Sequence, residues 1–194
     1  MLIPDYNQRI ASYAADVNKS ASDIDRSTAY ARASQQCYQS AFTKLVADRK
    51  AKTVNDTEGR KRLAEIVSGL KESNDLIVAV NGKAAEDLNN YTQAYEKDLQ
   101  QVGVQRADVV TVAKADTTPV VTPGKKKGTG SKPPKKPPLP TVPTEAVSTE
   151  KTFQTAQTKQ DESKKVASAG KAQIEGTCRD PNLADWAPVP CPNV

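Results

Sequence analysis

The chain has 194 residues, of which 37% are hydrophobic and 5% aromatic, and it contains no histidine. These fractions exclude one thick hydrophobic core and favour long amphipathic helices that share a narrow interface. The formal net charge of +5 arises in one segment, residues 119–143, which hold six lysines and no acid. Residues 1–118 hold 16 basic and 16 acidic side chains, and residues 144–194 hold six basic and seven acidic side chains. The excess positive charge therefore lies in one predicted linker. This distribution argues against a basic surface on a folded domain that binds nucleic acid.

The first predicted element is a long helix that starts after Pro4. Large and small side chains alternate along it at spacings of three and four residues, the heptad pattern of helices that pack along a narrow interface. Serine and alanine fill most of the alternate positions, which favours close approach of an antiparallel neighbour. The large side chains of this pattern are Ile10, Tyr13, Val17, Ile24, Tyr38 and Leu45.

A cluster of Asn, Asp, Thr and Gly at residues 53–59 predicts a turn, with Asn55 or Asp56 as the N-cap of the next helix. The second helix should be about as long as the first, and Gly103 is expected in its interior. We therefore expect an all-α fold with a long, coiled-coil-like antiparallel hairpin over residues 1–118. The heptad pattern of the second helix is carried by Leu63, Leu70, Ile77 and Tyr91.

The heptad residues of both helices form a predicted association seam. Two isolated helices with so narrow an apolar surface bury too little area to fold firmly. The seam should therefore also pack against a further surface. That surface is a second copy of the chain, a third helix of the same chain, or a larger assembly.

Residues 119–143 form a predicted extended linker rich in lysine and proline. Proline occupies every third position through Pro134, Pro137, Pro140 and Pro143, which is the period of polyproline II. The lysines of this linker are Lys125, Lys126, Lys127, Lys132, Lys135 and Lys136. In composition the linker resembles the Lys-Pro spacers of TonB-type energy transducers and cell-envelope lipoproteins, and this resemblance implies a segment that bridges a gap. Two alternatives remain open, namely a PxxP ligand for an SH3-like groove and a cationic contact with an anionic surface.

Residues 144–176 carry a weaker copy of the heptad pattern. Phe153 and Ile174 are the large apolar residues of a row that otherwise holds alanine and glutamine. With so few anchors, two outcomes remain open for this segment. It either forms a third helix that docks on the hairpin or stays disordered.

The last predicted element is a tail, residues 177–194, closed by a disulfide between Cys178 and Cys191. The two cysteines flank a short segment that contains three prolines and the only tryptophan, Trp186. Cross-linking would hold a tail that has few apolar groups of its own, and it implies an oxidising compartment. We expect Trp186 to contact a distal partner, and Cys37 to be a small buried residue on a helix.

No catalytic, cofactor-binding or metal-binding residues are assigned, because the chain lacks histidine and the GxSxG and HExxH motifs.

The leading hypothesis is a non-enzymatic structural or adaptor protein of an extracytoplasmic assembly, in the periplasm or cell envelope. Its protein partner would be a second copy or another chain. Since the N-terminus shows no signal-peptide pattern, this hypothesis requires a leader absent from the sequence shown. The alternatives are a virion component, such as a bacteriophage structural or ejection protein, and a binder of nucleic acid or an anionic surface through the linker lysines. The longest apolar run, residues 76–80, is too short to span a membrane.

Overall fold

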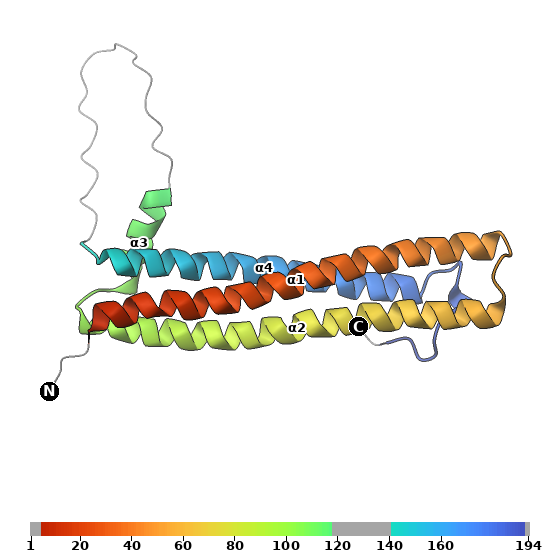
Figure 1. Cartoon of the computed structure of the whole chain (residues 1–194), viewed down its shortest axis with the longest axis horizontal. Helices are drawn as coiled ribbons and strands as arrows, with labels where there is room; N and C mark the ends of the chain where they lie inside the picture. Colours follow the sequence, from red (N-terminus) through yellow and green to blue (C-terminus); the bar gives the residue numbers. More distant parts are fainter. Residues whose placement is uncertain (1–4, 118–140, 193–194) are drawn as a thin grey trace, which may run out of the picture. The chain divides into compact units, whose positions relative to one another are not determined.

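The computed structural model describes residues 5–117 and 141–192. These residues form an all-α fold, as predicted, with helices α1 (Tyr6–Lys50), α2 (Asp56–Gln101), α3 (Arg106–Thr117) and α4 (Thr144–Cys178) and the 3-10 helix η1 (Ala184–Trp186) (Figure 1). The contacts divide the chain into two units. Unit 1 comprises Met1–Asn18 and Leu88–Thr155, and unit 2 comprises Lys19–Asp87 and Ala156–Val194.

The turn between α1 and α2 ends one helix and starts the next within six residues. Lys52 adopts a positive φ of 57°, and the Thr53 N–H donates back to the Asp48 carbonyl at 2.9 Å. Asn55 caps α2, because its side-chain oxygen accepts a hydrogen bond from the Glu58 N–H at 2.9 Å. The predicted antiparallel hairpin is therefore confirmed, with helices of 45 and 46 residues.

The end of α2 differs from the prediction. Gly103 has a φ of 74°, and its N–H donates to the Gln100 carbonyl at 3.1 Å while the Val104 N–H donates to the Leu99 carbonyl at 3.0 Å. These two bonds form a Schellman motif, which ends a helix at a residue in the left-handed conformation. Gly103 is thus a helix terminator, and the twelve residues of α3 follow it in a separate helix.

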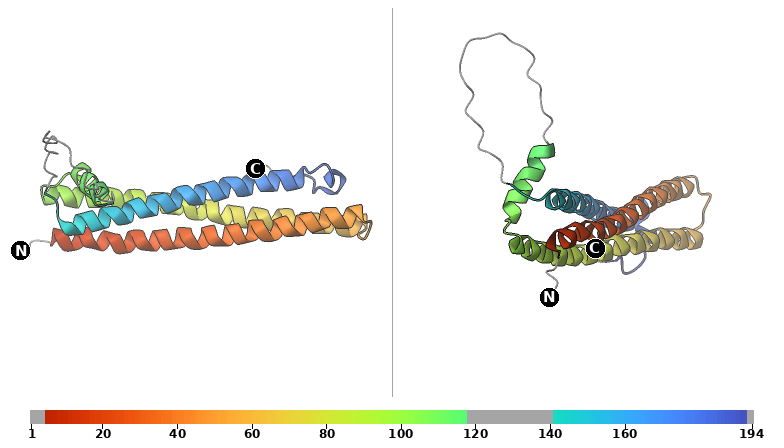
Figure 2. Two further views of the ribbon diagram at one scale, coloured as in Figure 1. Left: turned by 90° about the horizontal axis from the view of Figure 1, so that it is seen from above. Right: turned by 60° about the vertical axis from the view of Figure 1, so that its left-hand side comes forward.

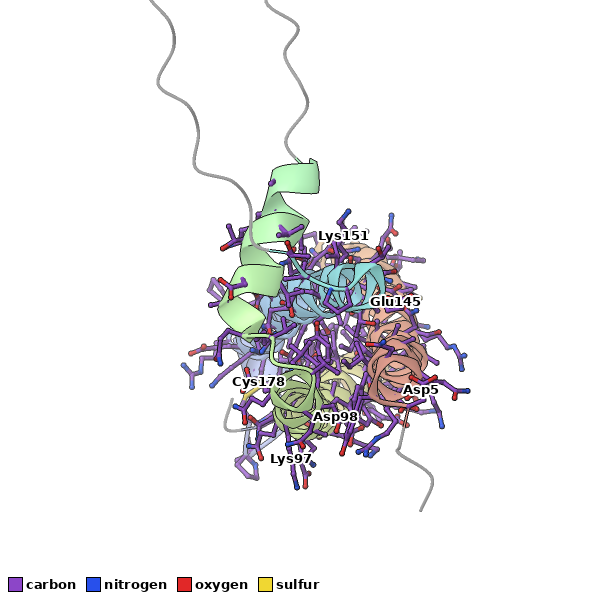
Figure 3. The ribbon with its side chains drawn as sticks, turned by 90° about the vertical axis from the view of Figure 1, so that its left-hand side faces the viewer. Asp5, Lys97, Asp98, Glu145, Lys151 and Cys178 are labelled. Carbon is purple, nitrogen blue, oxygen red and sulfur yellow. A yellow bond between two sulfur atoms is a disulfide. The ribbon has the colours of Figure 1, made fainter. Side chains whose placement is uncertain are left out.

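Unit 1 is built from the start of α1, the end of α2, α3 and the start of α4. Its buried residues include Ile10, Leu99, Val109 and Phe153, and side chains of α1, α2 and α4 converge between these helices when they are viewed end-on (Figure 3). The Thr149 hydroxyl donates to the Ile10 carbonyl at 3.0 Å. Of the two outcomes left open for residues 144–176, the structure shows the docked helix.

Unit 2 holds a second core at the turn end of the hairpin. Leu45 of α1, Leu63 and Leu70 of α2, and Ile174 of α4 belong to one buried cluster with Trp186. A smaller cluster joins Ala31, Ile77, Val166 and Ala167. In this unit α4 therefore lies beside α1 and α2 (Figures 1 and 2), which supplies the third helix that the hairpin needs.

The predicted linker lies outside the described residues except for residues 141–143. Pro143 immediately precedes α4, and its carbonyl accepts a hydrogen bond from the Val147 N–H at 3.2 Å. The helices on either side of the linker, α3 and the start of α4, both belong to unit 1. The elements that precede and follow the linker therefore belong to the same unit.

Candidate functional site

The tail forms a clamp at the turn end of unit 2, built from the disulfide, η1 and Trp186. Cys178, the last residue of α4, bonds to Cys191 with a Cα–Cα distance of 6.2 Å, so the predicted disulfide is confirmed. Trp186 is only 2% exposed, and its indole N–H donates to Asp56 Oδ1 at 3.1 Å. A Cβ atom at Gly59 would overlap the indole ring. The ring therefore packs on α2 at a position that has no side chain.

Arg49, near the end of α1, holds this clamp from the other side. Its guanidinium lies 4.3 Å from the centre of the Trp186 ring and forms a two-pronged ion pair with Asp185, in which Nη2 lies 2.6 Å from Oδ2. The hydrogen bond from Arg49 lowers the pKa of Asp185. The same contact raises the pKa of Arg49. These contacts order η1 against both helices of the hairpin turn.

Trp186 therefore contacts the chain's own helices in place of the distal partner predicted from the sequence. The composition of the tail suggested an exposed ring, because it has few apolar neighbours in sequence. The neighbours that bury it lie far away in the sequence, on α1 and α2. Cys37, which we expected to be buried, is an exposed free thiol, since the buried positions of α1 continue through Ala31 and Leu45 on another face.

Unit 1 contains a polar cluster centred on the buried carboxylate of Glu150. Arg106 Nε lies 2.9 Å from Glu150 Oε2, and Arg106 Nη1 lies 3.0 Å from Glu96 Oε1. The Arg106 guanidinium also lies 5.4 Å from the centre of the Phe153 ring. Burial lowers the pKa of Arg106, but the hydrogen bonds to Glu150 and Glu96 outweigh that effect and the pKa ends above its usual value. Arg106 is the first residue of α3, so this cluster fastens α3 to α2 and α4.

A second buried carboxylate, Asp98 of α2 (Figure 3), is bound by α1. Arg9 Nη2 lies 3.1 Å from Asp98 Oδ1, and the Tyr13 hydroxyl donates to Asp98 Oδ2 at 2.9 Å. Burial, with the hydrogen bond to Asp98, raises the pKa of Tyr13. The Tyr95 hydroxyl donates to the Ala146 carbonyl at 2.9 Å, and burial raises the pKa of Tyr95. Each of these polar groups has a partner within unit 1, so their arrangement is that of structural cross-links between helices.

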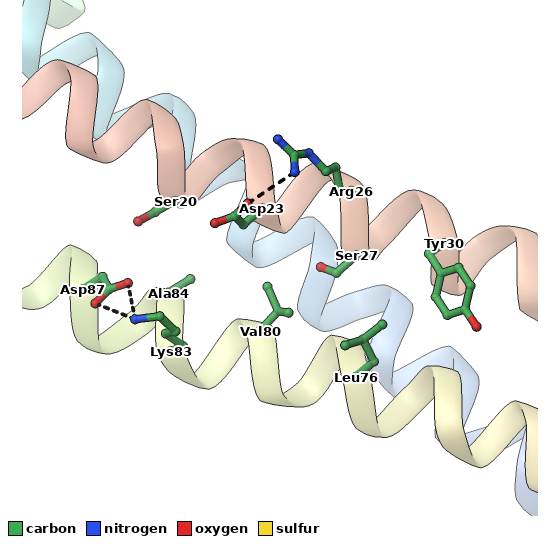
Figure 4. Close-up of a pocket in the computed structure, with 10 residues that line it drawn as sticks. All are labelled: Ser20, Asp23, Arg26, Ser27, Tyr30, Leu76, Val80, Lys83, Ala84 and Asp87. Carbon is green, nitrogen blue, oxygen red and sulfur yellow. Dashed lines mark hydrogen bonds and ion pairs between the residues drawn. The ribbon is translucent and has the colours of Figure 1, made fainter.

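A groove of about 390 Å³ lies between α1 and α2 in unit 2 (Figure 4). Its small residues Ser20, Ser27 and Ala84 are nearly buried, and the Ser27 hydroxyl donates to the Ile24 carbonyl of its own helix. Tyr30 and Leu76 line the groove and remain 51% and 46% exposed. This combination leaves an apolar groove with two large side chains at its edge.

The predicted association seam lies mostly inside the two units. The buried members, each at most 2% exposed, are Ile10, Val17, Ile24, Leu45, Leu63, Leu70 and Ile77. Tyr13, Tyr38 and Tyr91 are half-buried. Packing of α1, α2 and α4 therefore occupies much of the surface that the sequence assigned to association.

Sequence reasoning missed the close packing of Trp186 on Gly59 and the residues whose side chains cross-link the helices, namely Arg49, Tyr95, Asp98, Arg106 and Glu150. No local pattern distinguishes Glu150 or Asp98 from the exposed acids around them. Gly59 offered one signal, since a glycine in the first turn of a helix is unfavourable unless something packs closely against it.

Within the described residues, no group of three or more His, Cys, Asp or Glu side chains is placed to hold a metal ion. Among the helices of the same residues, none is both long and apolar enough to cross a membrane. No protein-family model, curated protein or solved structure matches this chain.

Proposed function

We propose that this protein is a non-enzymatic structural or adaptor component of an extracytoplasmic assembly of the cell envelope, in which the helical hairpin provides the surface for association. The disulfide-closed tail carries this proposal. The Cys178–Cys191 bond fixes a buried tryptophan at the end of the hairpin, and a structural disulfide of this kind persists in an oxidising compartment.

The distribution of polar groups also supports a structural role. The buried carboxylates of Asp98 and Glu150 are paired with arginines of the same unit. Neither acid faces a cleft as an isolated charge of the kind that enzymes use for acid–base chemistry. The polar groups of unit 1 thus hold helices in register, as expected of a scaffold.

Thiol mapping of the protein isolated from its native source under alkylating, nonreducing conditions tests this proposal. Cys37 is exposed and should be alkylated, which provides an internal control for the reagent. Cys178 and Cys191 should appear as one linked peptide pair. Alkylation of all three cysteines would contradict the extracytoplasmic assignment.

A second candidate function is binding of an anionic surface through the linker lysines. It is favoured by the composition of the linker, which holds six lysines and no acid, and by the finding that both helices flanking the linker belong to unit 1. Near an anionic membrane, each lysine contributes about 1 kcal/mol.

Cosedimentation with vesicles that contain phosphatidylserine tests this second function. Binding should weaken steeply with added salt and should be lost when the six linker lysines are replaced by glutamine. Neutral phosphatidylcholine vesicles provide the control. Equal binding of the wild type and the glutamine variant would eliminate this role.

A further inference from the structure

We infer that the groove between α1 and α2 is a homodimer interface, in which α1 of one copy lies on α2 of a second copy. This inference rests on the proposed adaptor function and names one partner for it. Among the described residues, four large hydrophobic side chains stand out as exposed. Two of the four, Tyr30 and Leu76, line this one groove.

The position of the groove explains why it is open. In unit 2, α4 contacts the hairpin through Ala31, Ile77 and Val166, on a different side of both helices from Tyr30 and Leu76. Leu76 directly precedes Ile77, so successive residues of one apolar run face different sides of α2. Ile77 is 0% exposed, whereas Leu76 is 46% exposed. One side of the hairpin is therefore covered by α4, whereas the described residues that line the groove all belong to α1 and α2.

The charges at the edge of the groove match a second copy better than a highly charged partner. Two acids and two bases line it and pair within their own helices, Arg26 with Asp23 at 4.0 Å and Lys83 with Asp87 at 3.1 Å (Figure 4), so their net charge is zero. A nucleic acid or an anionic membrane would be repelled by the acids as much as it is attracted by the bases. A self-complementary interface needs both signs, because each charge meets a counterpart on the symmetry-related surface.

The geometry of the hairpin specifies the pairs. Asp23 lies as many residues before the end of α1 at Lys50 as Lys83 lies after the start of α2 at Asp56, so these two residues are level across the groove (Figure 4). Tyr30 and Leu76 are level in the same way. A two-fold axis parallel to the helices places α1 over α2 of the other copy at the same level. Asp23 then faces Lys83 of the second copy in addition to the pairs that each forms with Arg26 and Asp87 of its own chain. Tyr30 faces Leu76 of the second copy, and each of these contacts occurs twice.

This arrangement has a favourable helix topology. The two hairpins form a four-helix array in which every neighbouring pair of helices is antiparallel, so the helix dipoles oppose one another. The apolar edge contributed by Tyr30 and Leu76 is short. We therefore expect a dissociation constant in the micromolar range, about 1–100 μM, which is typical of small interfaces.

Sedimentation equilibrium of the full, disulfide-closed chain over a wide concentration range tests the inference. All proteins compared, including the wild-type reference, carry Cys37→Ser, so that no intermolecular disulfide forms at this exposed position. Leu76→Arg should raise the dissociation constant at least about tenfold, because it places a charge in the apolar part of the interface. Val78→Arg is the matched control. Val78 lies on the same helix and is 53% exposed but does not line the groove, so its change should be within about twofold.

A charge exchange separates this arrangement from nonspecific association. Asp23→Lys and Lys83→Asp should each weaken the dimer by several-fold, because each places like charges opposite one another. The double variant restores opposite charges across the interface and should recover most of the wild-type affinity. Circular dichroism of each variant checks that the helices are intact.

Three outcomes would overturn the inference. They are a wild-type chain that stays monomeric at the highest concentration, equal effects of Leu76→Arg and Val78→Arg, or a double variant no better than the single ones. A monomer that retains the Cys178–Cys191 bond would reject the dimer and leave the adaptor function with a different partner. Free thiols at Cys178 and Cys191 in the native protein would reject the proposed compartment whatever the oligomeric state.

Discussion

Gly59 is the residue on which the tail clamp most directly depends. It lies in the first turns of α2, where a side chain would occupy the space of the Trp186 ring. Gly59→Ala should lower the free energy of unfolding by about 1–3 kcal/mol, the usual cost of overpacking. It should also shift the fluorescence of the only tryptophan to longer wavelength, because the ring becomes exposed to water.

Gly82→Ala is the control for this substitution. Gly82 also lies inside α2, but nothing lies within 4 Å of the position that its Cβ would occupy. Alanine should therefore stabilise the helix by up to about 1 kcal/mol without changing the fluorescence. Equal effects of the two substitutions in chemical denaturation would show that Trp186 does not pack on Gly59.

The raised pKa values of Tyr95 and Tyr13 in unit 1 predict a loss of stability at alkaline pH. Burial raises the pKa of Tyr95 above the value near 10 that it has in the unfolded chain. The folded state therefore holds this proton more tightly. The free energy of unfolding keeps its full value below about pH 10 and falls as the pH rises further. The raised pKa of Tyr13 acts in the same direction.

Denaturation at a series of pH values, with tyrosinate absorbance as the second signal, measures this effect. Tyr95→Phe removes the hydrogen bond to the Ala146 carbonyl and should destabilise the protein by about 1 kcal/mol at neutral pH. Its stability should then fall less steeply than that of the wild type above pH 10. Parallel curves for the two proteins would mean that Tyr95 does not titrate on unfolding.

Among the elements, α3 depends most on one polar contact. Its first residue, Arg106, joins Glu150 of α4 and Glu96 of α2, and the Glu150 side chain is 2% exposed. Glu150→Leu leaves Arg106 half-buried with only one acid. It should therefore destabilise unit 1 by about 2–4 kcal/mol. Hydrogen exchange should show the loss of protection first in α3.

The double variant Arg106→Met with Glu150→Leu should recover part of that loss, because it leaves no unpaired charge. Lys71→Ala is the control on an exposed surface, since Lys71 pairs with Asp75 and both side chains are about half exposed. It should have no measurable effect. A double variant as unstable as Glu150→Leu alone would indicate that packing, and not charge pairing, holds α3.

For the whole molecule, the division into two units predicts a local response to reduction. The Cys178–Cys191 bond closes a loop with a sequence separation of 13, and opening it should destabilise the docked tail by about 3 kcal/mol. Reduction should shift the Trp186 fluorescence and increase hydrogen exchange in unit 2. The helical circular dichroism and the exchange of unit 1 should be nearly unchanged. Global unfolding on reduction would contradict this independence.

The features predicted correctly from the sequence are those encoded by local patterns. The heptads of α1 and α2, the turn before Asn55 and the pairing of Cys178 with Cys191 each depend on residues close together in the chain. The burial of Trp186 depends on contacts with α1 and α2, which are distant in the sequence. The end of α2 at Gly103 depends on the left-handed conformation of that one residue, which the heptad pattern does not reveal. The contact of Arg106 with Glu150 joins residues 44 positions apart, and the exposure of Cys37 reflects which face of α1 meets α4.

Because α3 and the start of α4 lie in the same unit, the peptide bonds between them can be cut without separating the parts that pack together. Trypsin cleaves after lysine unless proline follows, and four of the six lysines in residues 125–136 are not followed by proline. Both disulfide cysteines lie on the C-terminal side of those bonds, so no covalent link would join the resulting fragments. The buried contacts of α4 with α1 and α2 should nevertheless keep the fragments associated. The protein should therefore also assemble from two separately synthesised polypeptides, one ending and the other starting within the lysine-rich segment.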